Sequence, residues 1–160
     1  MTENDKEPPQ KGGSKLKEKP QQWQWITFEI AGTRYCHPIA DIEEIFHYTA
    51  PTPVPGSPSG IEGILNIRGS IATIYSGRTL FESEPAEPND DWRIITLAFD
   101  QNFIGMIVDR VDEIIHFDPE KIEHTHEVSD QRTLVKGTIY AQERLYSVLD
   151  FYRLVDFDDE

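Results

Sequence analysis

The sequence predicts a mainly β protein made of two similar small barrels that form one compact body. The segment 42–47 returns 69 positions later as 111–116, and the segment 61–80 returns 74 positions later as 135–154. Apolar and polar residues alternate in short runs that end at turns, which is the period of half-buried strands. Nearly all of the expected connections are short and no long helix is expected, so small barrels are favoured.

The first repeat, about residues 23–81, is expected to hold five strands and one short helical segment. Ile26, Phe28 and Ile30 alternate with other residues and mark the first strand. Pro38 cannot donate to a ladder, so one helical turn is expected after it. Four prolines within 50–60 predict a stiff, extended connection. Strands are expected at 23–30, 34–37, 45–48, 61–67 and 70–75, and the helical segment at 77–81.

The second repeat, about residues 92–155, is expected to follow the same scheme after an acidic loop at 82–91. Strands are expected at 93–99, 103–108, 111–117, 134–140 and 144–148, with a turn at 119–122, a polar loop at 124–131 and a C-terminal helix at 149–155. Each repeat has roughly 65–70 residues, close to the size at which a single domain is only marginally stable. We therefore expect the two repeats to share a core or to exchange segments, with a seam between them.

Both ends of the chain are expected to lie outside the folded region, which we place at 22–156. Residues 1–21 are rich in Lys and Pro and contain almost no apolar residue except Leu16. Such a segment cannot bury enough surface to offset the entropy of ordering it, so a disordered polar tail is predicted. Residues 157–160 form a short acidic tail.

Charge and composition narrow the classes of partner. The formal net charge is −14, and because the tail 1–21 contributes five Lys and four acids, the rest of the chain carries −15. Such a body repels phosphate backbones and anionic lipid, which disfavours nucleic acid and membrane surfaces. The acidity either keeps the protein in solution or suits a cationic partner. A lone Cys36 excludes an intrachain disulfide and indicates a reducing, cytoplasmic location.

The repeats differ most at one turn. Asn66-Ile67-Arg68-Gly69 in the first repeat corresponds to Tyr140-Ala141-Gln142-Glu143 in the second. Gly69 can adopt positive φ at a hairpin tip, which would leave Arg68 projecting outward. Its planar, multi-donor head suits carboxylates or carbonyls on a partner. The alternative is an ion pair within the chain, for instance with Glu62 or Glu43.

Motifs for catalysis, cofactors and metals are weak. Cys36 and His37 are neighbours in a strand and point to opposite faces, so they are poorly placed to act as nucleophile and base. His124 and His126 have a spacing compatible with metal, but a closed zinc site needs four ligands and no further ligand cluster is present. We therefore predict no enzyme activity, no catalytic residue, no cofactor and no metal site.

About residues 23–155 contain a set of segments that occur together: Trp25-Ile26-Thr27-Phe28, Pro38-Ile39, Ile42-Glu43-Glu44-Ile45, Pro55-Gly56-Ser57-Pro58, Gly63-Ile64-Leu65-Asn66-Ile67-Arg68-Gly69 and Val108-Asp109. In this order they resemble the CheW family, the coupling proteins of bacterial chemosensory arrays. The resemblance implies two five-stranded SH3-like barrels that exchange segments. It also implies a non-enzymatic adaptor that joins the CheA histidine kinase to the cytoplasmic tips of chemoreceptors, at receptor arrays and without inserting into the membrane.

The resemblance also implies which residues contact the receptor and the kinase. They are Gly63, Asn66, Arg68 and Gly69 of the signature turn, Glu44 and Ile45 of a coupling pair, and the apolar Ile39, Ile42 and Val108 along the seam. Glu44 has a counterpart in Glu113, which favours a repeated structural task for that position. Where the family usually has Val-Ile-Asp after the turn, this chain has Ile74-Tyr75-Ser76 and lacks the acid.

Two other functions compete with this one. The chain could serve as the adaptor of another chemosensory-like pathway, such as pilus motility. It could instead be a sensor domain that binds a small ligand in the groove between the barrels.

Overall fold

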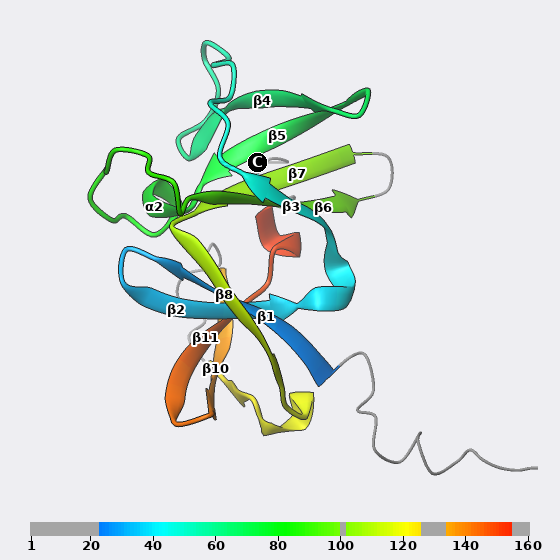
Figure 1. The fold of residues 1–160 in the computed structure, drawn as a ribbon, viewed down its shortest axis with the longest axis vertical. Helices are drawn as coiled ribbons and strands as arrows, with labels where there is room; N and C mark the ends of the chain where they lie inside the picture. The colour runs from blue at the N-terminus through cyan, green and yellow to red at the C-terminus, as the bar shows by residue number, and fades with distance from the viewer. Residues whose placement is uncertain (1–22, 100–101, 126–133, 155–160) are drawn as a thin grey trace, which may run out of the picture.

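The computed structural model describes residues 23–99, 102–125 and 134–154, and these residues form two β-sheets, one above the other in Figure 1. The strands are β1 (Gln24–Ile30), β2 (Thr33–Pro38), β3 (Ile42–His47), β4 (Ile61–Ile67), β5 (Ser70–Ser76), β6 (Arg93–Phe99), β7 (Asn102–Val108), β8 (Arg110–His116), β9 (Glu123–His124), β10 (Val135–Ala141) and β11 (Arg144–Leu149). The upper sheet has the order β3-β6-β7-β5-β4, and the lower sheet has the order β8-β1-β2-β11-β10-β9.

Each sheet takes strands from both repeats. The first hairpin of the first repeat, β1–β2, lies in the lower sheet between β8 and β11 of the second repeat. The corresponding hairpin of the second repeat, β6–β7, lies in the upper sheet between β3 and β5 of the first. The joins to β11 and β5 are parallel, whereas the hairpin pairings are antiparallel. The expected mainly β architecture with exchanged segments is thus confirmed.

Three hydrophobic clusters form the core of the protein. The largest cluster joins residues of both sheets and fills the seam, and among its members are Phe28, Tyr35, Leu97, Met106 and Val108. A second cluster lies within the lower sheet and includes Trp25, Cys36 and Tyr146. A third lies within the upper sheet and includes Ile74, Trp92 and Ile94. Each sheet therefore has a small core of its own, and the shared cluster binds the two together, as expected for repeats too small to be stable alone.

Connecting elements are short. The 3₁₀ turn η2 (Ile39–Asp41) joins β2 to β3, the helix α2 (Gly77–Leu80) follows β5, and the 3₁₀ turn η3 (Pro119–Lys121) precedes β9. The segment with four prolines makes a single bridge, between Thr52 and Ile64 of β4. No helix among the described residues has the length and apolar character needed to cross a membrane.

Some expected boundaries are wrong. Pro38 is the last residue of β2, with its Cα opposite that of Trp25, because a strand end tolerates a residue that cannot donate. The next strand begins at Ile42, three residues early, since η2 makes only one turn. His124 lies in β9 and Leu149 in β11, where pairing with β10 extends the sheet beyond the expected loop and helix boundaries.

Several expected features fall partly or wholly outside the described residues. Of the expected C-terminal helix at 149–155, residues 152–154 are helical, residues 149–151 are not, and residue 155 lies outside the described residues. The tails 1–21 and 157–160, most of the polar loop and residues 100–101 of one turn also lie outside.

Candidate functional site

The turn between β4 and β5 has two residues, and both adopt positive φ. The φ angle is 54° at Arg68 and 87° at Gly69. The Gly69 amide donates a hydrogen bond to the Asn66 side-chain oxygen at 2.9 Å, which closes the turn. A Cβ added to Gly69 would meet nothing within 4 Å, so this glycine serves the backbone conformation and not a close contact. Asn66 thus stabilises the turn through its hydrogen bond, and Gly69 permits the positive φ angle that the turn needs.

Arg68 extends from this turn and pairs with Glu44 of β3. Its Nη2 atom lies 3.2 Å from the Glu44 carboxylate. The arginine side chain is 80% exposed, whereas that of Glu44 is 28% exposed. The alternative of an intrachain ion pair is therefore realised with Glu44, not with Glu62 or Glu43. An ion pair this exposed contributes only about 0–1 kcal/mol, so Arg68 is oriented by its own chain without being enclosed by it.

Glu44 also has a backbone role that its counterpart shares. The Thr96 hydroxyl donates to the Glu44 carbonyl at 3.0 Å, beside a register shift between β3 and β6. In the other repeat, the Thr27 hydroxyl donates to the Glu113 carbonyl at 2.7 Å and accepts from the Glu113 amide at 3.0 Å. The repeated glutamate therefore does mark a repeated structural task. In the described residues, only Glu44 of the two adds an arginine partner.

Sequence reasoning missed the two threonines. Thr27 and Thr96 are 69 positions apart, like the glutamates whose backbone they hold, and both are buried. A threonine that recurs at the same offset as the glutamates was the available signal, because a buried hydroxyl needs a hydrogen-bond partner.

Gly63 lies at the start of β4, away from the exposed turn, and is buried. Its φ angle is 152°, and a Cβ there would come within 2.2 Å of the Thr52 carbonyl oxygen. Gly137 occupies the equivalent place in β10, where a Cβ would come within 2.6 Å of the Glu123 carbonyl. Each glycine thus admits a neighbouring backbone segment, and Gly63 acts on the site only through the position of β4.

The apolar site residues divide by burial. Ile42 and Ile45 of β3 are half-buried and pack against the cluster that fills the seam, and Ile39 of η2 is half-buried as well. Val108 is fully buried within that cluster. The three isoleucines can offer part of their surface to a partner, whereas Val108 supports them from inside.

Ser76 occupies the place where the family usually has an acid. Its hydroxyl accepts a hydrogen bond from the Thr79 amide at 3.2 Å and so caps α2. Serine and aspartate are both favoured at this capping position. The substitution therefore retains the local backbone contact and removes one negative charge.

Arg78 and Asp109 form a contact that the residue pattern did not predict. The guanidinium binds Asp109 through Nη2 at 2.7 Å and Nε at 3.2 Å, and the same carboxylate accepts from the Ala31 amide at 2.9 Å. Both side chains are about four-fifths covered. This bidentate pair ties α2 to the β1–β2 turn and to the junction of β7 and β8, and thus ties the repeats together across the seam.

Neither a metal-binding cluster nor a reactive cysteine is found among the residues that the structure describes. No set of three or more His, Cys, Asp or Glu side chains within the described part of the chain could hold a metal ion. Burial raises the pKa of the Cys36 thiol to about 12, so this sulfur stays protonated and is a poor nucleophile at neutral pH. His37 points away from it, with Nδ1 3.2 Å from the Leu149 carbonyl.

Comparison with known proteins gives a consistent picture. A family model described as the CheW-like domain matches residues 24–158. The chain is 30% identical to the chemotaxis protein CheW of Helicobacter pylori, over 86% of this chain and 84% of that protein. It is 26% identical to the chemotaxis protein CheW of Bacillus subtilis, over 82% and 85% of the two chains.

A solved structure agrees with these relatives. The scaffolding protein TtCheW of Thermoanaerobacter tengcongensis superposes with a TM-score of 0.73 at 27% identity, covering 81% of this chain and 89% of that one. The family match spans nearly all of the described fold, including both hairpins and the arginine turn. The chain therefore belongs to the CheW family of chemotaxis coupling adaptors.

Proposed function

We propose that this chain joins the cytoplasmic tip of a chemoreceptor to the regulatory domain of the CheA histidine kinase, and that it works in the cytoplasm at receptor arrays. Membership of the CheW family and similarity to a scaffolding protein support this role. The adaptor performs no chemical step. It holds two partners at once, which raises the effective concentration of each for the other.

The exposed Arg68 on its braced turn is the observation that carries the proposal. Asn66 fixes the turn and Glu44 orients the guanidinium, so the ordering entropy of a long side chain is partly removed before a partner arrives. The equivalent turn in the second repeat has Gln142 in place of the arginine. Arg68 is not required by the fold, and only the first repeat holds such a cation outward at this turn. This difference favours a role for Arg68 in binding a partner protein.

The neighbouring residues complete the proposed surface. Glu44 and Ile45 lie in β3, and η2 with Ile39 leads into that strand. Half-buried isoleucines along the seam offer apolar surface to a helical receptor tip, while Arg68 and Glu44 offer charge of both signs. Control of the kinase then requires this assembly to bind two signalling states of the receptor with different affinity.

Binding measurements on the full chain test the proposal. Titration calorimetry with a purified CheA regulatory domain, and separately with a receptor cytoplasmic fragment, should show binding to both. Arg68→Ala should weaken at least one of the two by roughly 30-fold, equivalent to about 2 kcal/mol for a central interface arginine. Gln142→Ala is the matched control at the equivalent turn and should leave both affinities unchanged.

Two results would contradict the proposal. One is a failure of the folded protein to bind either partner. The other is an equal loss of affinity for Gln142→Ala and Arg68→Ala, which would remove the distinction between the turns. Circular dichroism and urea unfolding separate either result from loss of fold, since Arg68→Ala should change stability by less than about 0.5 kcal/mol.

A second candidate is the same adaptor role in a pilus motility pathway. The chain is 27% identical to protein PilI of Pseudomonas aeruginosa, over 61% of this chain and 54% of that protein. That match is shorter than those to the chemotaxis proteins. Titration against the CheA-type kinase domains of a flagellar and of a pilus system decides between the two, because the true partner should bind more tightly.

The sensor alternative has less support. The seam, where a ligand pocket was expected, is filled by the largest hydrophobic cluster. Two pockets with linings in the described residues lie at one end of the upper sheet instead.

A further inference from the structure

A pocket opens at the end of the upper sheet that lies away from the arginine turn. It has a volume of about 180 Å³, and its lining includes Tyr48, Glu62, Arg78, Pro85, Pro88 and Trp92. An adjoining pocket of about 340 Å³ shares Tyr48, Pro88 and Trp92 and adds His47, Asn89 and Asp90. Glu62 stands near the start of β4 and Arg68 just beyond its end, so about 20 Å of strand separates this pocket from the turn.

Aromatic and proline rings form one wall. Tyr48 and Trp92 meet edge to face, with ring centroids 5.5 Å apart and planes at 88°. The Tyr48 amide also donates to the Trp92 carbonyl at 3.1 Å, which fixes the two residues relative to each other. Trp92 is only 8% exposed and belongs to the core of the upper sheet, so this wall is rigid. Rings of this kind attract a cation through the negative face of the π system.

Acidic side chains beside these rings have no ion-pair partner among the described residues. This holds for Glu62 and Asp90, which line the pockets, and for the other acids of the loop 82–91. Burial raises the pKa of the Tyr48 hydroxyl, and the negative charge of Glu62 raises this pKa further. Arg78 lines the same pocket, but its charge is balanced by the bidentate contact with Asp109.

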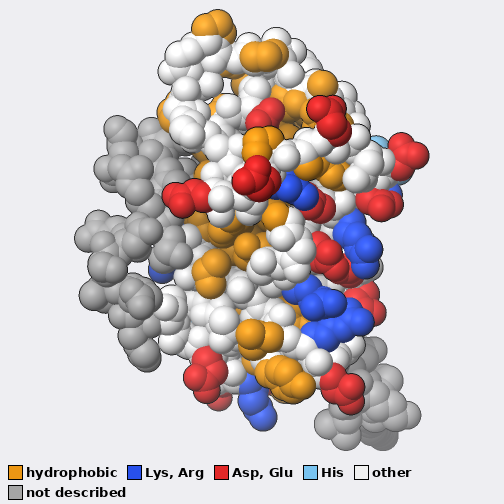
Figure 2. Space-filling view, turned by 90° about the vertical axis from the view of Figure 1, so that its left-hand side faces the viewer, with side chains coloured by type: hydrophobic (Ala, Val, Ile, Leu, Met, Phe, Trp, Pro, Cys, Tyr) orange, Lys and Arg blue, Asp and Glu red, His pale blue; other side chains and the backbone are white. Residues whose placement is uncertain are grey.

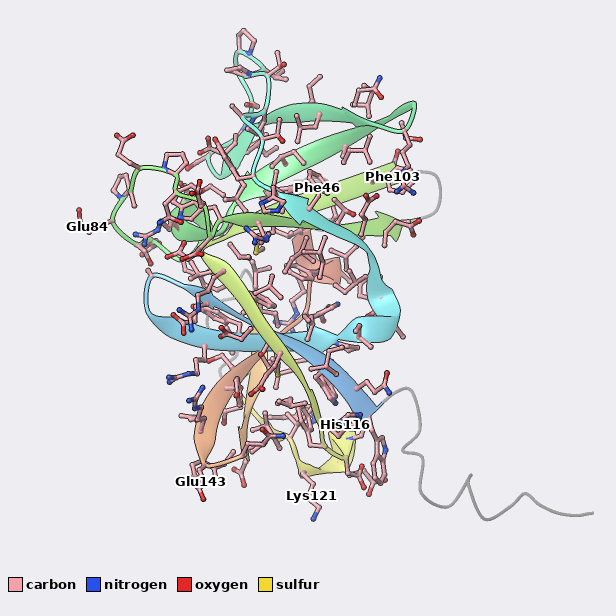
Figure 3. All side chains as sticks on the ribbon, viewed as in Figure 1. Phe46, Glu84, Phe103, His116, Lys121 and Glu143 are labelled. Carbon is pink, nitrogen blue, oxygen red and sulfur yellow. The ribbon has the colours of Figure 1, made fainter. Side chains whose placement is uncertain are left out.

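Two arginines hold the acidic loop over the pocket through its backbone. Arg78 Nη1 donates to the Glu84 carbonyl at 2.6 Å. Arg93 Nη1 donates to the carbonyls of Asp90 and Trp92 at 2.8 and 2.9 Å. The carboxylates themselves remain unpaired by these contacts. Figure 3 shows Glu84 at the outer side of the loop, and Figure 2 shows acidic side chains beside hydrophobic ones on this side of the molecule.

We propose that this pocket binds the guanidinium group of an arginine side chain presented by a partner protein. A guanidinium is flat and weakly hydrated, so it can stack on Tyr48 and on the proline rings while its N–H groups reach Glu62 or Asp90. The site goes beyond the coupling role of the arginine turn, because it lies at the other end of the sheet and selects the opposite charge.

The test uses the full chain and two short capped peptides, Gly-Arg-Gly and its neutral counterpart with citrulline in place of arginine. Binding is followed by NMR through the assigned indole N–H signal of Trp92. The arginine peptide should give a saturable shift at millimolar concentration, and the citrulline peptide should bind at least tenfold more weakly. Glu62→Gln should weaken arginine binding about fivefold, because the exposed carboxylate is removed without disturbing the core.

Control variants distinguish binding of the arginine peptide in this pocket from its non-specific electrostatic attraction to an acidic protein. Glu143→Gln removes an acid from the far β10–β11 turn, shown at the lower tip in Figure 3, and should leave the shift unchanged. Tyr48→Leu should weaken binding because it removes the ring on which the guanidinium stacks, and unchanged binding would contradict the proposal. Equal binding of both peptides, no saturation, or equal weakening by Glu62→Gln and Glu143→Gln would each overturn the proposal. None of these measurements involves a receptor or kinase, so their outcome is independent of the coupling function.

Discussion

The β4–β5 and β10–β11 hairpins have the same backbone and different surface chemistry. Each contains a register shift beside a buried glycine, Gly63 or Gly137, and each ends in a two-residue turn at positive φ. In the second turn the residues at positive φ are Gln142 and Glu143, so this conformation is adopted there without glycine. Duplication has kept the geometry that the fold needs.

Side chains at the two tips diverge. Both tips expose one apolar residue at the same place, Ile71 at 55% and Leu145 at 60%. The tips differ at the other two positions, where the first presents Asn66 and Arg68 and the second presents Tyr140 and Gln142. Cross-strand partners occupy matching positions, since Asn66 faces Ile71 and Tyr140 faces Leu145. Positions where both hairpins need the same backbone geometry, such as Gly63 and Gly137, are therefore kept for folding. Exposed positions at the tips do not have this requirement, so each repeat can use them to bind a different partner.

The largest expected effect tests the shared constraint. Gly63→Ala and Gly137→Ala each force a Cβ against a backbone carbonyl that cannot move without breaking a pairing. Each should lower the free energy of unfolding by about 3 kcal/mol or more, with Gly63→Ala the worse because its contact is shorter. Urea unfolding followed by circular dichroism measures both. A neutral effect at either glycine would show that the two hairpins are not constrained alike.

The threonine pair should give a smaller effect. Thr27→Val removes two hydrogen bonds to Glu113 and should cost about 2 kcal/mol, while Thr96→Val removes one to Glu44 and should cost about 1 kcal/mol. Thr138→Val, in a half-buried position of β10, serves as the control and should stay within about 0.5 kcal/mol. A larger loss of stability for Thr96→Val than for Thr27→Val would show that the two threonines do not have equivalent roles beside the two register shifts.

The smallest expected effect concerns a contact found in one repeat only. His37 Nε2 lies 3.3 Å from Asp41 Oδ2 without a well-formed hydrogen bond between them, and the positions 69 residues later hold Met106 and Arg110. The pKa of the Asp41 carboxyl is nevertheless lowered, chiefly by His37. A lowered folded-state pKa means that the stabilisation is complete above the unfolded value of about 4 and is lost as pH falls through the folded value.

Asp41→Asn therefore should lower stability by less than about 1 kcal/mol near neutral pH, since the carboxylate is partly exposed to solvent. The difference from the unchanged protein should shrink below about pH 4. Urea unfolding at pH 7, 5 and 3.5 measures it. A difference that grows on acidification would show that Asp41 is not stabilised as the anion.

Much of the local structure could be predicted from the residues. Sequence reasoning placed β4 at 61–67 and β6 at 93–99, with the same bounds as in the structure, because turn residues end these short apolar runs. The start of β3 was missed by three residues, since the spacing of Ile39, Ile42 and Ile45 resembles a longer helical turn. Pro38 was excluded from a strand whose last position it occupies.

The candidate site could be predicted only in part. The contrast between the turns pointed to Arg68, and the recurrence of Glu44 as Glu113 pointed to a structural role that the hydrogen bonds show. The arginine's partner was not predictable, because Glu44 is 24 residues away and reaches Arg68 only through the curvature of the upper sheet. Val108 was named as a site residue, although burial confines it to support from within.

The order of residues alone was enough to establish a duplicated β protein, an acidic body and one turn unlike its counterpart. These properties depend on periodicity, charge and local backbone preference, which act over a few residues. Which hairpins are exchanged, and the Arg78–Asp109 contact, are decided only when strands from different repeats are brought together. The Glu44–Arg68 pair lies within the first repeat and forms only when β3 and the β4–β5 turn come close in the folded upper sheet. Such pairings depend on long-range packing, since each repeat lacks enough buried surface to hold its own strands.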